Sequence, residues 1–269
     1  MKIPFLTKVM RILLELESEK NFSYDMKYYH KLQGFIYSLL KDTEFSLLHD
    51  KKGYKFFSFS NIFPLPKDKR RMIINAGENK KLIIASPNEL FIKILEEKLR
   101  IIRDSKKTIN IGEAQFSLEN LKIFSVSLGK SSVLRSMTPI VVRIPEKNYE
   151  KYGIPSEFRK KRYVYWRPQY SFEAFIKQLE ENLVKKFNEF YSTNLEIENV
   201  FELFEFKKSV VSHAIISGEE QKIVGSIWDF IFTHLSEEQK KLLEFGVDCG
   251  FGERNSLGFG FMNVVKVRK

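Results

Sequence analysis

The hydrophobic and polar positions of the first 111 residues predict strands and helices in alternation. Apolar residues at helical spacing predict one helix that carries the stripe from Leu32 to Leu40 and a second helix over 88–102. Alternating apolar and polar residues predict strands over 8–16, 54–63, 71–75, 82–85 and 108–111. The order of strand, helix, strands, helix and strand is the βαββαβ pattern of a ferredoxin-like domain.

Turn and cap residues mark the ends of these elements. Asn21, Ser23 and Asp25 predict a turn and the start of the first helix, and Asn88 after Pro87 predicts the N-cap of the second. The segment 76–79, with the sequence Ala-Gly-Glu-Asn, predicts a hairpin that joins the strands 71–75 and 82–85.

The second part of the chain repeats this order of elements. Helices are predicted over 172–191 and over 236–245, the latter with a capping box of Ser236 and Gln239. Strands are predicted over 121–126, 140–144, 198–206, 210–216 and 261–267, with a further apolar stretch over 223–232. The fold class that follows is α+β, with two tandem ferredoxin-like domains packed side by side. We place them at 1–115 and 116–269, with the boundary near 112–120.

Composition indicates a folded protein that is not embedded in a membrane. Of the 269 residues, 43% are hydrophobic and 29% are charged, which is close to the globular average and excludes a disordered or collagen-like chain. No apolar run approaches the roughly 18 residues that a membrane-spanning helix needs, and charged residues interrupt the start of the chain. We therefore expect a cytoplasmic protein.

The charge and the aromatic residues favour a polyanionic partner. The formal net charge is +11, and 25 Phe and 11 Tyr are present, many of them next to basic residues. Segments such as 54–56 and 162–167 combine aromatic rings that can stack on bases with cations that can hold phosphates. One of the basic clusters 67–71 and 159–162 is expected to line an RNA path.

Other chemistries find no support in the sequence. A single cysteine, Cys249, excludes an internal disulfide and a cysteine-based zinc site. The acidic residues form ordinary helix-surface pairs without clustered metal ligands, so we expect no metal and no cofactor. The glycines near the C-terminus lack the third glycine of a dinucleotide-binding fingerprint, and the Gly-Lys-Ser at 129–131 lacks the first glycine of a P-loop.

Those C-terminal glycines are the most informative feature of the chain. Four of them stand within eleven residues as Gly-Phe-Gly, five residues, Gly-Phe-Gly, from Gly250 to Gly260. Backbone without Cβ atoms can approach a phosphate or another chain segment closely. Arg254 and Asn255 stand at the tip of this glycine-rich loop.

The doubled Gly-Phe-Gly resembles the signature loop of the CRISPR-associated repeat-processing endoribonucleases, within the RAMP superfamily of RNA-binding proteins. Its position before a final strand is also that family's position. The resemblance covers most of the chain, since the family is built as two tandem ferredoxin-like, RRM-like domains. It implies cleavage of precursor CRISPR RNA within the repeat.

Candidate catalytic residues come from the histidines and from this resemblance. RNA cleavage without a metal needs groups that take and give protons near neutral pH, and histidine suits both tasks. His49 lies in a lysine-rich loop, 47–55, which could neutralise the charge of a phosphorane. The family carries a histidine in this loop, a lysine six residues on and a tyrosine in the first helix. Here these positions match His49, Lys55 and Tyr37, the last within Gly34-Phe35-Ile36-Tyr37.

The resemblance implies a transesterification that leaves a 2′,3′-cyclic phosphate and a 5′-hydroxyl. His49 would act as general base or general acid, Lys55 would stabilise phosphate charge, and Tyr37 would orient the 2′-hydroxyl. Lys52 could replace Lys55, and His30 is a secondary candidate, two helical turns before Tyr37. RNA contacts are expected from Lys52, Gly250, Gly252, Arg254, Asn255, Gly258 and Gly260.

The implied partners are CRISPR repeat RNA, proteins of CRISPR effector complexes and a second copy of the chain. The alternative is a RAMP protein that binds repeat RNA without cutting it, or that serves as a subunit of an effector complex. The presence of Tyr37, His49 and Lys55 together favours the enzyme.

Overall fold

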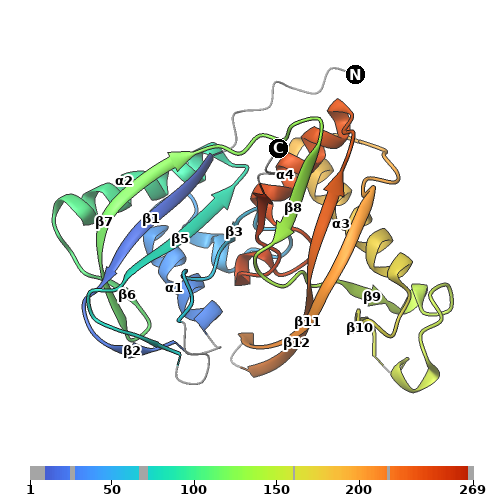
Figure 1. The fold of residues 1–269 in the computed structure, drawn as a ribbon, viewed down its shortest axis with the longest axis horizontal. Helices are drawn as coiled ribbons and strands as arrows, with labels where there is room; N and C mark the ends of the chain where they lie inside the picture. Colours follow the sequence, from blue (N-terminus) through green and yellow to red (C-terminus); the bar gives the residue numbers. More distant parts are fainter. Residues whose placement is uncertain (1–9, 25–27, 67–71, 160, 217–218, 266–269) are drawn as a thin grey trace.

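The computed structural model describes the chain in five segments, which are residues 10–24, 28–66, 72–159, 161–216 and 219–265. Within them two larger antiparallel sheets lie side by side, each with two helices (Figure 1), and two further sheets have two strands each. The fold is the predicted α+β class with tandem ferredoxin-like domains.

The first sheet has the strand order β3-β5-β1-β7-β6. Its strands are β1 (Met10–Ser18), β3 (Ser58–Phe59), β5 (Asn79–Ser86), β6 (Ile109–Ile111) and β7 (Ala114–Phe124). Without the edge strand β6, the order β7-β1-β5-β3 is that of a ferredoxin-like sheet. Alternate residues of β1 are buried and share a core with α1 (Tyr28–Leu39) and α2 (Glu89–Asp104), as the hydrophobic pattern predicts.

Three sequence predictions for this domain were wrong. Of the strand 54–63 only β3 forms, and β4 (Ile73–Ile74) pairs with β2 (Phe22–Ser23) instead of β5, so the predicted hairpin does not form. The turn at 76–79 bonds to Ser18 at the end of β1, and this contact directs β5 along β1. The strand beside β1 is β7, whereas the predicted closing strand 108–111 is only an edge.

The position of β7 also bears on the domain boundary. This strand continues through 115 and 116, and its residues 116–124 pair with β1 of the first sheet. The first strand of the second sheet, β8 (Ser132–Ser136), begins only at 132. The chain therefore passes from one sheet to the other over 125–131.

The second sheet repeats the strand order of the first. Its strands β8, β11 (Leu203–Ile216), β12 (Glu219–Phe232) and β13 (Met262–Val265) are arranged as β11-β12-β8-β13. Helix α3 (Phe172–Tyr191) has the predicted bounds. Helix α4 (Glu237–Cys249) begins with the predicted capping box of Ser236 and Gln239.

The strands of this domain differ from the prediction in several places. Of the strand predicted over 121–126, the residues 121–124 belong to β7 and pair with β1 in the first sheet. β8 was missed, and the segment 140–144 contributes instead to β9 (Arg143–Pro145), which pairs with β10 (Tyr163–Tyr165) in a separate ribbon. The two strands predicted over 198–216 are one strand, β11, with an irregularity after Phe206. The apolar stretch 223–232 is part of β12. Residues 266–267 of the predicted last strand lie outside the described residues.

A buried ion pair joins the two domains. Arg11 of β1 donates from Nε to Oδ1 of Asp248 in α4 at 2.7 Å, and it also donates to the carbonyl oxygens of Val247 and Met262. Both charged side chains are fully buried. In Figure 1, α4 and the segment that follows it lie between the two sheets, next to β3.

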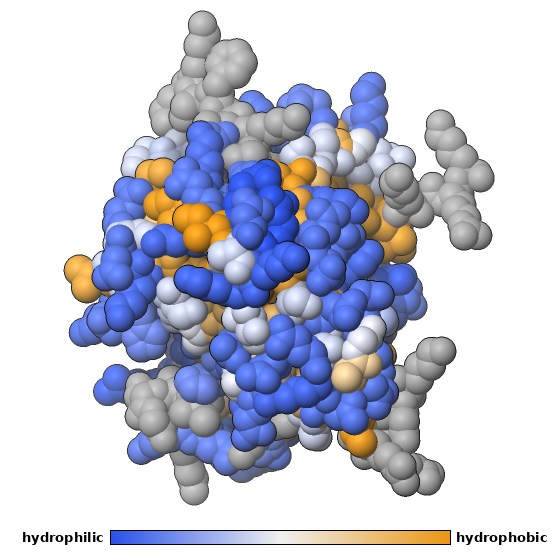
Figure 2. All heavy atoms as spheres, turned by 90° about the vertical axis from the view of Figure 1, so that its left-hand side faces the viewer, coloured by the Kyte–Doolittle hydropathy of each residue, from blue (hydrophilic) through white to orange (hydrophobic). Residues whose placement is uncertain are grey.

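The outer side of the first domain is a polar surface. Figure 2, which looks onto this side, shows mostly hydrophilic atoms with apolar atoms in small groups between them. Among the described helices none is long and apolar enough to span a bilayer.

Candidate active site

The three residues proposed for catalysis meet at one place in the first domain. Tyr37 comes from α1, His49 from the short 3₁₀ helix Ser46–His49, and Lys55 from the segment before β3. The ammonium of Lys55 donates to the hydroxyl of Tyr37 at 3.1 Å and to the backbone carbonyl of His49 at 2.6 Å. The Tyr37 and His49 rings stand edge to face with centroids 5.1 Å apart.

The surroundings of these residues set what each can do with a proton. Burial raises the pKa of Tyr37 to about 12, so its hydroxyl is a hydrogen-bond donor at neutral pH. Burial also lowers the pKa of Lys55, while the nearby Asp50 carboxylate opposes this shift. The His49 side chain is 68% exposed, and its Nδ1 lies 3.0 Å from Oδ1 of Asp50.

His49 and Lys55 border a cleft of about 1150 Å³ between the domains, whereas Tyr37 is not among the residues that line it. Its walls come from the loop before β3, the ribbon β9–β10, helix α3 and the glycine-rich loop. Its basic lining residues are His30, His49, Lys55, Arg143, Arg162, Lys185, Lys186 and Arg254. The acidic lining residues are Glu181 and Glu253. Such a surplus of positive charge in a concave site attracts a polyanion.

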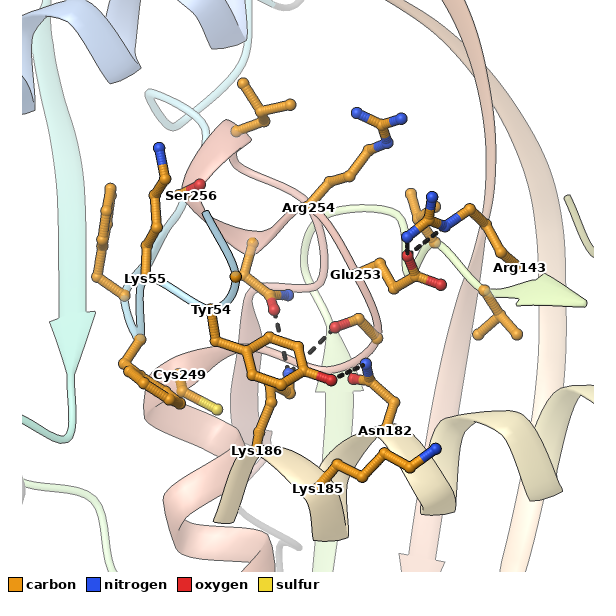
Figure 3. Close-up of a pocket in the computed structure, with 18 of the residues that line it drawn as sticks. Tyr54, Lys55, Arg143, Asn182, Lys185, Lys186, Cys249, Glu253, Arg254 and Ser256 are labelled. Carbon is orange, nitrogen blue, oxygen red and sulfur yellow. Dashed lines mark hydrogen bonds and ion pairs between the residues drawn. The ribbon is translucent and has the colours of Figure 1, made fainter. Parts of the chain in front are cut away.

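Side chains from both domains face this space. In Figure 3 the amino group of Lys55 and the guanidinium of Arg254 point away from α3, which carries Lys185 and Lys186. Arg143 pairs with Glu253, and its guanidinium lies 4.6 Å from the ring centroid of Tyr163. The cleft therefore offers cations and an aromatic ring along one surface.

The four glycines of the loop pack against their own chain. All have positive φ, from 67° to 89°. A Cβ on Gly260 would lie 1.9 Å from the carbonyl oxygen of Phe251, and one on Gly252 would lie 2.5 Å from that of Val141. A Cβ on Gly250 would meet Asn255, and one on Gly258 would meet Tyr29 and Phe59. The structure thus explains the glycines by close packing within the protein, a use of glycine that the sequence argument allowed beside phosphate binding.

The other residues that were expected to contact RNA differ in whether they line the cleft. Arg254 lines the cleft, and its Nε has no hydrogen-bond partner in the described structure. The amide of Asn255 is already engaged, because Nδ2 donates to the carbonyl oxygens of Phe251 and Phe259. Lys52 is exposed on its loop and does not line the cleft, whereas His30 is exposed and does. The basic cluster 67–71 lies outside the described residues.

Four cleft residues escaped the sequence argument. Arg143 and Gln33 sit in ordinary strand and helix patterns, and nothing in the sequence marks them. Ser256 directly follows Asn255 in the glycine-rich loop. Lys186 follows Phe175, Leu179 and Leu183 on the buried stripe of α3, and a lysine on an apolar stripe was a signal that could have been used.

Metal binding is tested by the side chains that could provide ligands. Among the described residues no group of three or more His, Cys, Asp or Glu side chains is placed to hold a metal ion.

Comparison with known proteins identifies relatives of the chain. The family model "CRISPR associated protein Cas6, C-terminal" matches residues 119–264. A CRISPR-associated endoribonuclease Cas6 2 of Methanocaldococcus jannaschii is 34% identical over 96% of this chain and 100% of its own. A CRISPR-associated endoribonuclease Cas6 of Haloferax mediterranei is 30% identical over 97% of this chain and 95% of its own. A solved structure entitled "An RAMP protein binding different RNA substrates" has the same fold, with a TM-score of 0.68 and 24% identity over 96% of this chain and all of that one.

Proposed function

The chain belongs to the Cas6 family of CRISPR-associated endoribonucleases, and we propose that it cuts precursor CRISPR RNA within the repeat without a metal ion. The observation that carries the proposal is the contact of Lys55 with both Tyr37 and the His49 backbone at the edge of a basic cleft. This arrangement brings a proton-transfer group, a cation and a hydroxyl group close together. All three could then act on the same bound phosphate.

In the proposed reaction the 2′-oxygen of the ribose attacks the neighbouring phosphorus. The 2′-hydroxyl loses its proton to a base, a bond forms from O2′ to phosphorus, and the bond from phosphorus to O5′ breaks. The leaving O5′ takes a proton from an acid, so the products are a 2′,3′-cyclic phosphate and a 5′-hydroxyl. No water, metal or other reactant is consumed.

The three side chains take different parts in this reaction. His49 transfers a proton, because histidine is the residue type of the three that exchanges protons near neutral pH. Asp50 holds Nδ1 of His49, which leaves Nε2 for the RNA. The charged Lys55 stabilises the phosphate in the transition state. Tyr37 keeps its proton, since its pKa is about 12, and orients the attacking ribose by hydrogen bonding.

The cleft would hold the RNA strand beyond the scissile phosphate. Arg254 and Lys185 provide cations for phosphates, and the Tyr163 ring beside Arg143 provides a surface on which a base can stack. We expect the affinity for repeat RNA to fall steeply with salt, as it does wherever lysine and arginine neutralise phosphates.

The test uses repeat RNA of the host with a single 2′-deoxy substitution at the nucleotide before the cut. In excess EDTA, the unmodified RNA should be cut once and leave a cyclic phosphate. The deoxy RNA should bind with similar affinity and remain intact, because the attacking oxygen is missing. Cleavage of the deoxy RNA, or a requirement for added Mg²⁺, would refute the mechanism. Binding without any cleavage of the unmodified RNA would favour a binding protein.

A further inference from the structure

Helix α3 contains a lysine whose charge is enclosed by the protein. Lys186 is only 1% exposed, and its ammonium donates to the carbonyl oxygens of Gly250 and Gly252 and to Oδ1 of Asn255. All three acceptors are neutral. Burial lowers the pKa of this lysine, and the nearby Cys249 and Glu253 oppose that shift.

The acceptors of Lys186 belong to the glycine-rich loop. Asn255 accepts a hydrogen bond from the lysine through Oδ1. Its Nδ2 in turn donates to the carbonyl oxygens of Phe251 and Phe259, each at 3.0 Å. These two phenylalanines are the centres of the two Gly-Phe-Gly units. One ammonium and one amide therefore hold both ends of the loop in a fixed relation.

The same loop touches the catalytic helix of the other domain. The carbonyl oxygen of Ser256, the residue after Asn255, accepts from Nε2 of Gln33 at 2.8 Å. Gln33 stands one helical turn before Tyr37 on α1. Burial raises the pKa of the Tyr37 hydroxyl, and hydrogen bonding from Ser256 and from Gln33 opposes this shift. Hydrogen bonds from Lys186 to Asn255 and from Gln33 to Ser256, with the covalent backbone between Asn255 and Ser256, thus connect the lysine to the helix that carries Tyr37.

We propose that Lys186 is a positioning residue of the nuclease, which holds the glycine-rich loop so that Ser256 fixes Tyr37 across the domain boundary. This inference rests on the proposed function, since Tyr37 matters only if the site cuts RNA. The lysine itself does not touch the RNA. Its ammonium lies beneath the loop, and its effect reaches the reacting atoms through Asn255, Ser256 and α1.

Filling space does not explain a lysine at this place. An apolar residue of similar volume would occupy the site without the cost of removing an ammonium from water. What a methionine would lack is the three hydrogen bonds to the loop. The lysine therefore serves the geometry of the loop, at some cost in desolvation.

The experiment compares Lys186→Met with wild type in a single-turnover assay at saturating repeat RNA. Because a displacement of about 1 Å in a catalytic group can cost on the order of 10²-fold in rate, we expect a loss of that order with RNA affinity changed less than about threefold. Lys93→Met, an exposed lysine on α2 away from the cleft, is the matched control and should leave both quantities unchanged. Equal losses of rate and affinity, or an unchanged rate, would overturn the proposal.

A double-mutant cycle with Gln33→Ala tests the route. If Lys186 acts through Ser256 and Gln33, the double variant should cut no more slowly than the slower single variant. Additive losses would contradict this route. Should Lys186→Met fail to fold, Asn255→Ala breaks the same series of hydrogen bonds and should show the same split between rate and affinity.

Hydrogen exchange separates this proposal from the proposed function. In Lys186→Met the amides of Phe251, Gly258 and Gly260, which bond to carbonyls of the loop and its neighbours, should exchange faster than in wild type. Exchange equal to wild type would refute the positioning role even if wild type cuts no RNA. Absence of cleavage by wild type with faster exchange in the variant would refute only the proposed function.

Discussion

The ammonium of Lys55 lies 3.1 Å from the hydroxyl of Tyr37. It also bonds to the backbone carbonyl of His49, so one lysine connects the first helix to the loop that carries the histidine. His49 follows Tyr37 by 12 positions, and Lys55 follows His49 by 6. The chain turns back after α1, and this turn brings the three residues together. Removal of the Lys55 side chain should therefore disturb both the tyrosine and the loop that carries the histidine.

The charge of Lys55 should be essential for cleavage. Lys55→Ala removes the cation that stabilises the phosphate, and we expect a loss of about 10²- to 10³-fold in the single-turnover rate. Lys55→Arg keeps the charge and should retain more of the rate. The comparison is made at saturating RNA, so that a loss of affinity does not enter the result. Equal rates for Lys55→Ala and wild type would exclude this role.

The pH profile should report the lowered pKa of Lys55. The cleavage needs the protonated ammonium, and burial lowers its pKa below the ordinary lysine value of 10.5. The rate of wild type should therefore fall at alkaline pH before a free lysine would lose its proton. In Lys55→Arg this alkaline fall should move to higher pH, because arginine stays charged. If wild type and Lys55→Arg lose activity at the same alkaline pH, a group other than Lys55 causes that loss.

Tyr37 should act as a hydrogen-bond donor and not as a base. Its pKa of about 12 keeps it protonated, so Tyr37→Phe removes the hydrogen bonds of the hydroxyl, among them the one from Lys55, without removing a proton acceptor. We expect the rate to fall about 10-fold, with the shape of the pH profile unchanged. Loss of a titrating limb from the profile of Tyr37→Phe would show that the phenol itself transfers a proton.

The close packing of Gly260 should make it intolerant of any side chain. In Gly260→Ala the new methyl group would meet the carbonyl oxygen of Phe251, and we expect a loss of about 2–4 kcal/mol in the free energy of unfolding. The matched variant is Gly77→Ala, which also has positive φ but has no atom within 4 Å of the new Cβ. It should lose only about 1–2 kcal/mol. Urea unfolding measures both, and equal losses would show that backbone strain alone matters.

The buried pair of Arg11 and Asp248 should hold the domains together. Arg11→Met leaves the Asp248 carboxylate buried without its counter-charge, which costs about 3–5 kcal/mol in the free energy of unfolding near neutral pH. Burial already raises the pKa of Asp248 from 3.8 to about 6, and the loss of Arg11 raises it further.

The stability of Arg11→Met should then depend on pH with a known sign. A carboxyl group whose pKa is higher in the folded than in the unfolded state favours folding at low pH, and this contribution is lost as the pH rises through the folded value. The deficit of the variant against wild type should therefore grow as the pH rises above about 6, the pKa of Asp248 in wild type. A deficit that does not change over this range would mean that Asp248 is not buried as a carboxylate.

Much of the fold could be read from the hydrophobic pattern. Helix α3 has the predicted bounds because its stripe of apolar residues is long and regular, and the Ser236 capping box marks the start of α4. β8 was missed because its buried face is Ser132, Leu134 and Ser136, in which the serines hide the alternation. Ser136 is buried because it bonds to the backbone of Trp228, a partner 92 positions away that no local pattern reveals.

The candidate site could be predicted only in part for a similar reason. Tyr37, His49 and Lys55 lie within 19 residues of one another, and the structure brings them together. The residues that connect the site to the second domain, such as Gln33 and Ser256, are 223 positions apart. Their contact depends on how the two domains pack, which the sequence pattern of each domain does not specify.

The measurement that tests the account most directly is cleavage of host repeat RNA in excess EDTA by wild type and by His49→Ala, with the product ends mapped. We expect wild type to make a single cut that leaves a 2′,3′-cyclic phosphate, and His49→Ala to lose about 10²- to 10⁴-fold in rate while it still binds the RNA. His30 of α1 is the other histidine that lines the cleft, and His30→Ala should lose less of the cleavage rate than His49→Ala. Cleavage by His49→Ala at the rate of wild type would contradict the assignment of the active site.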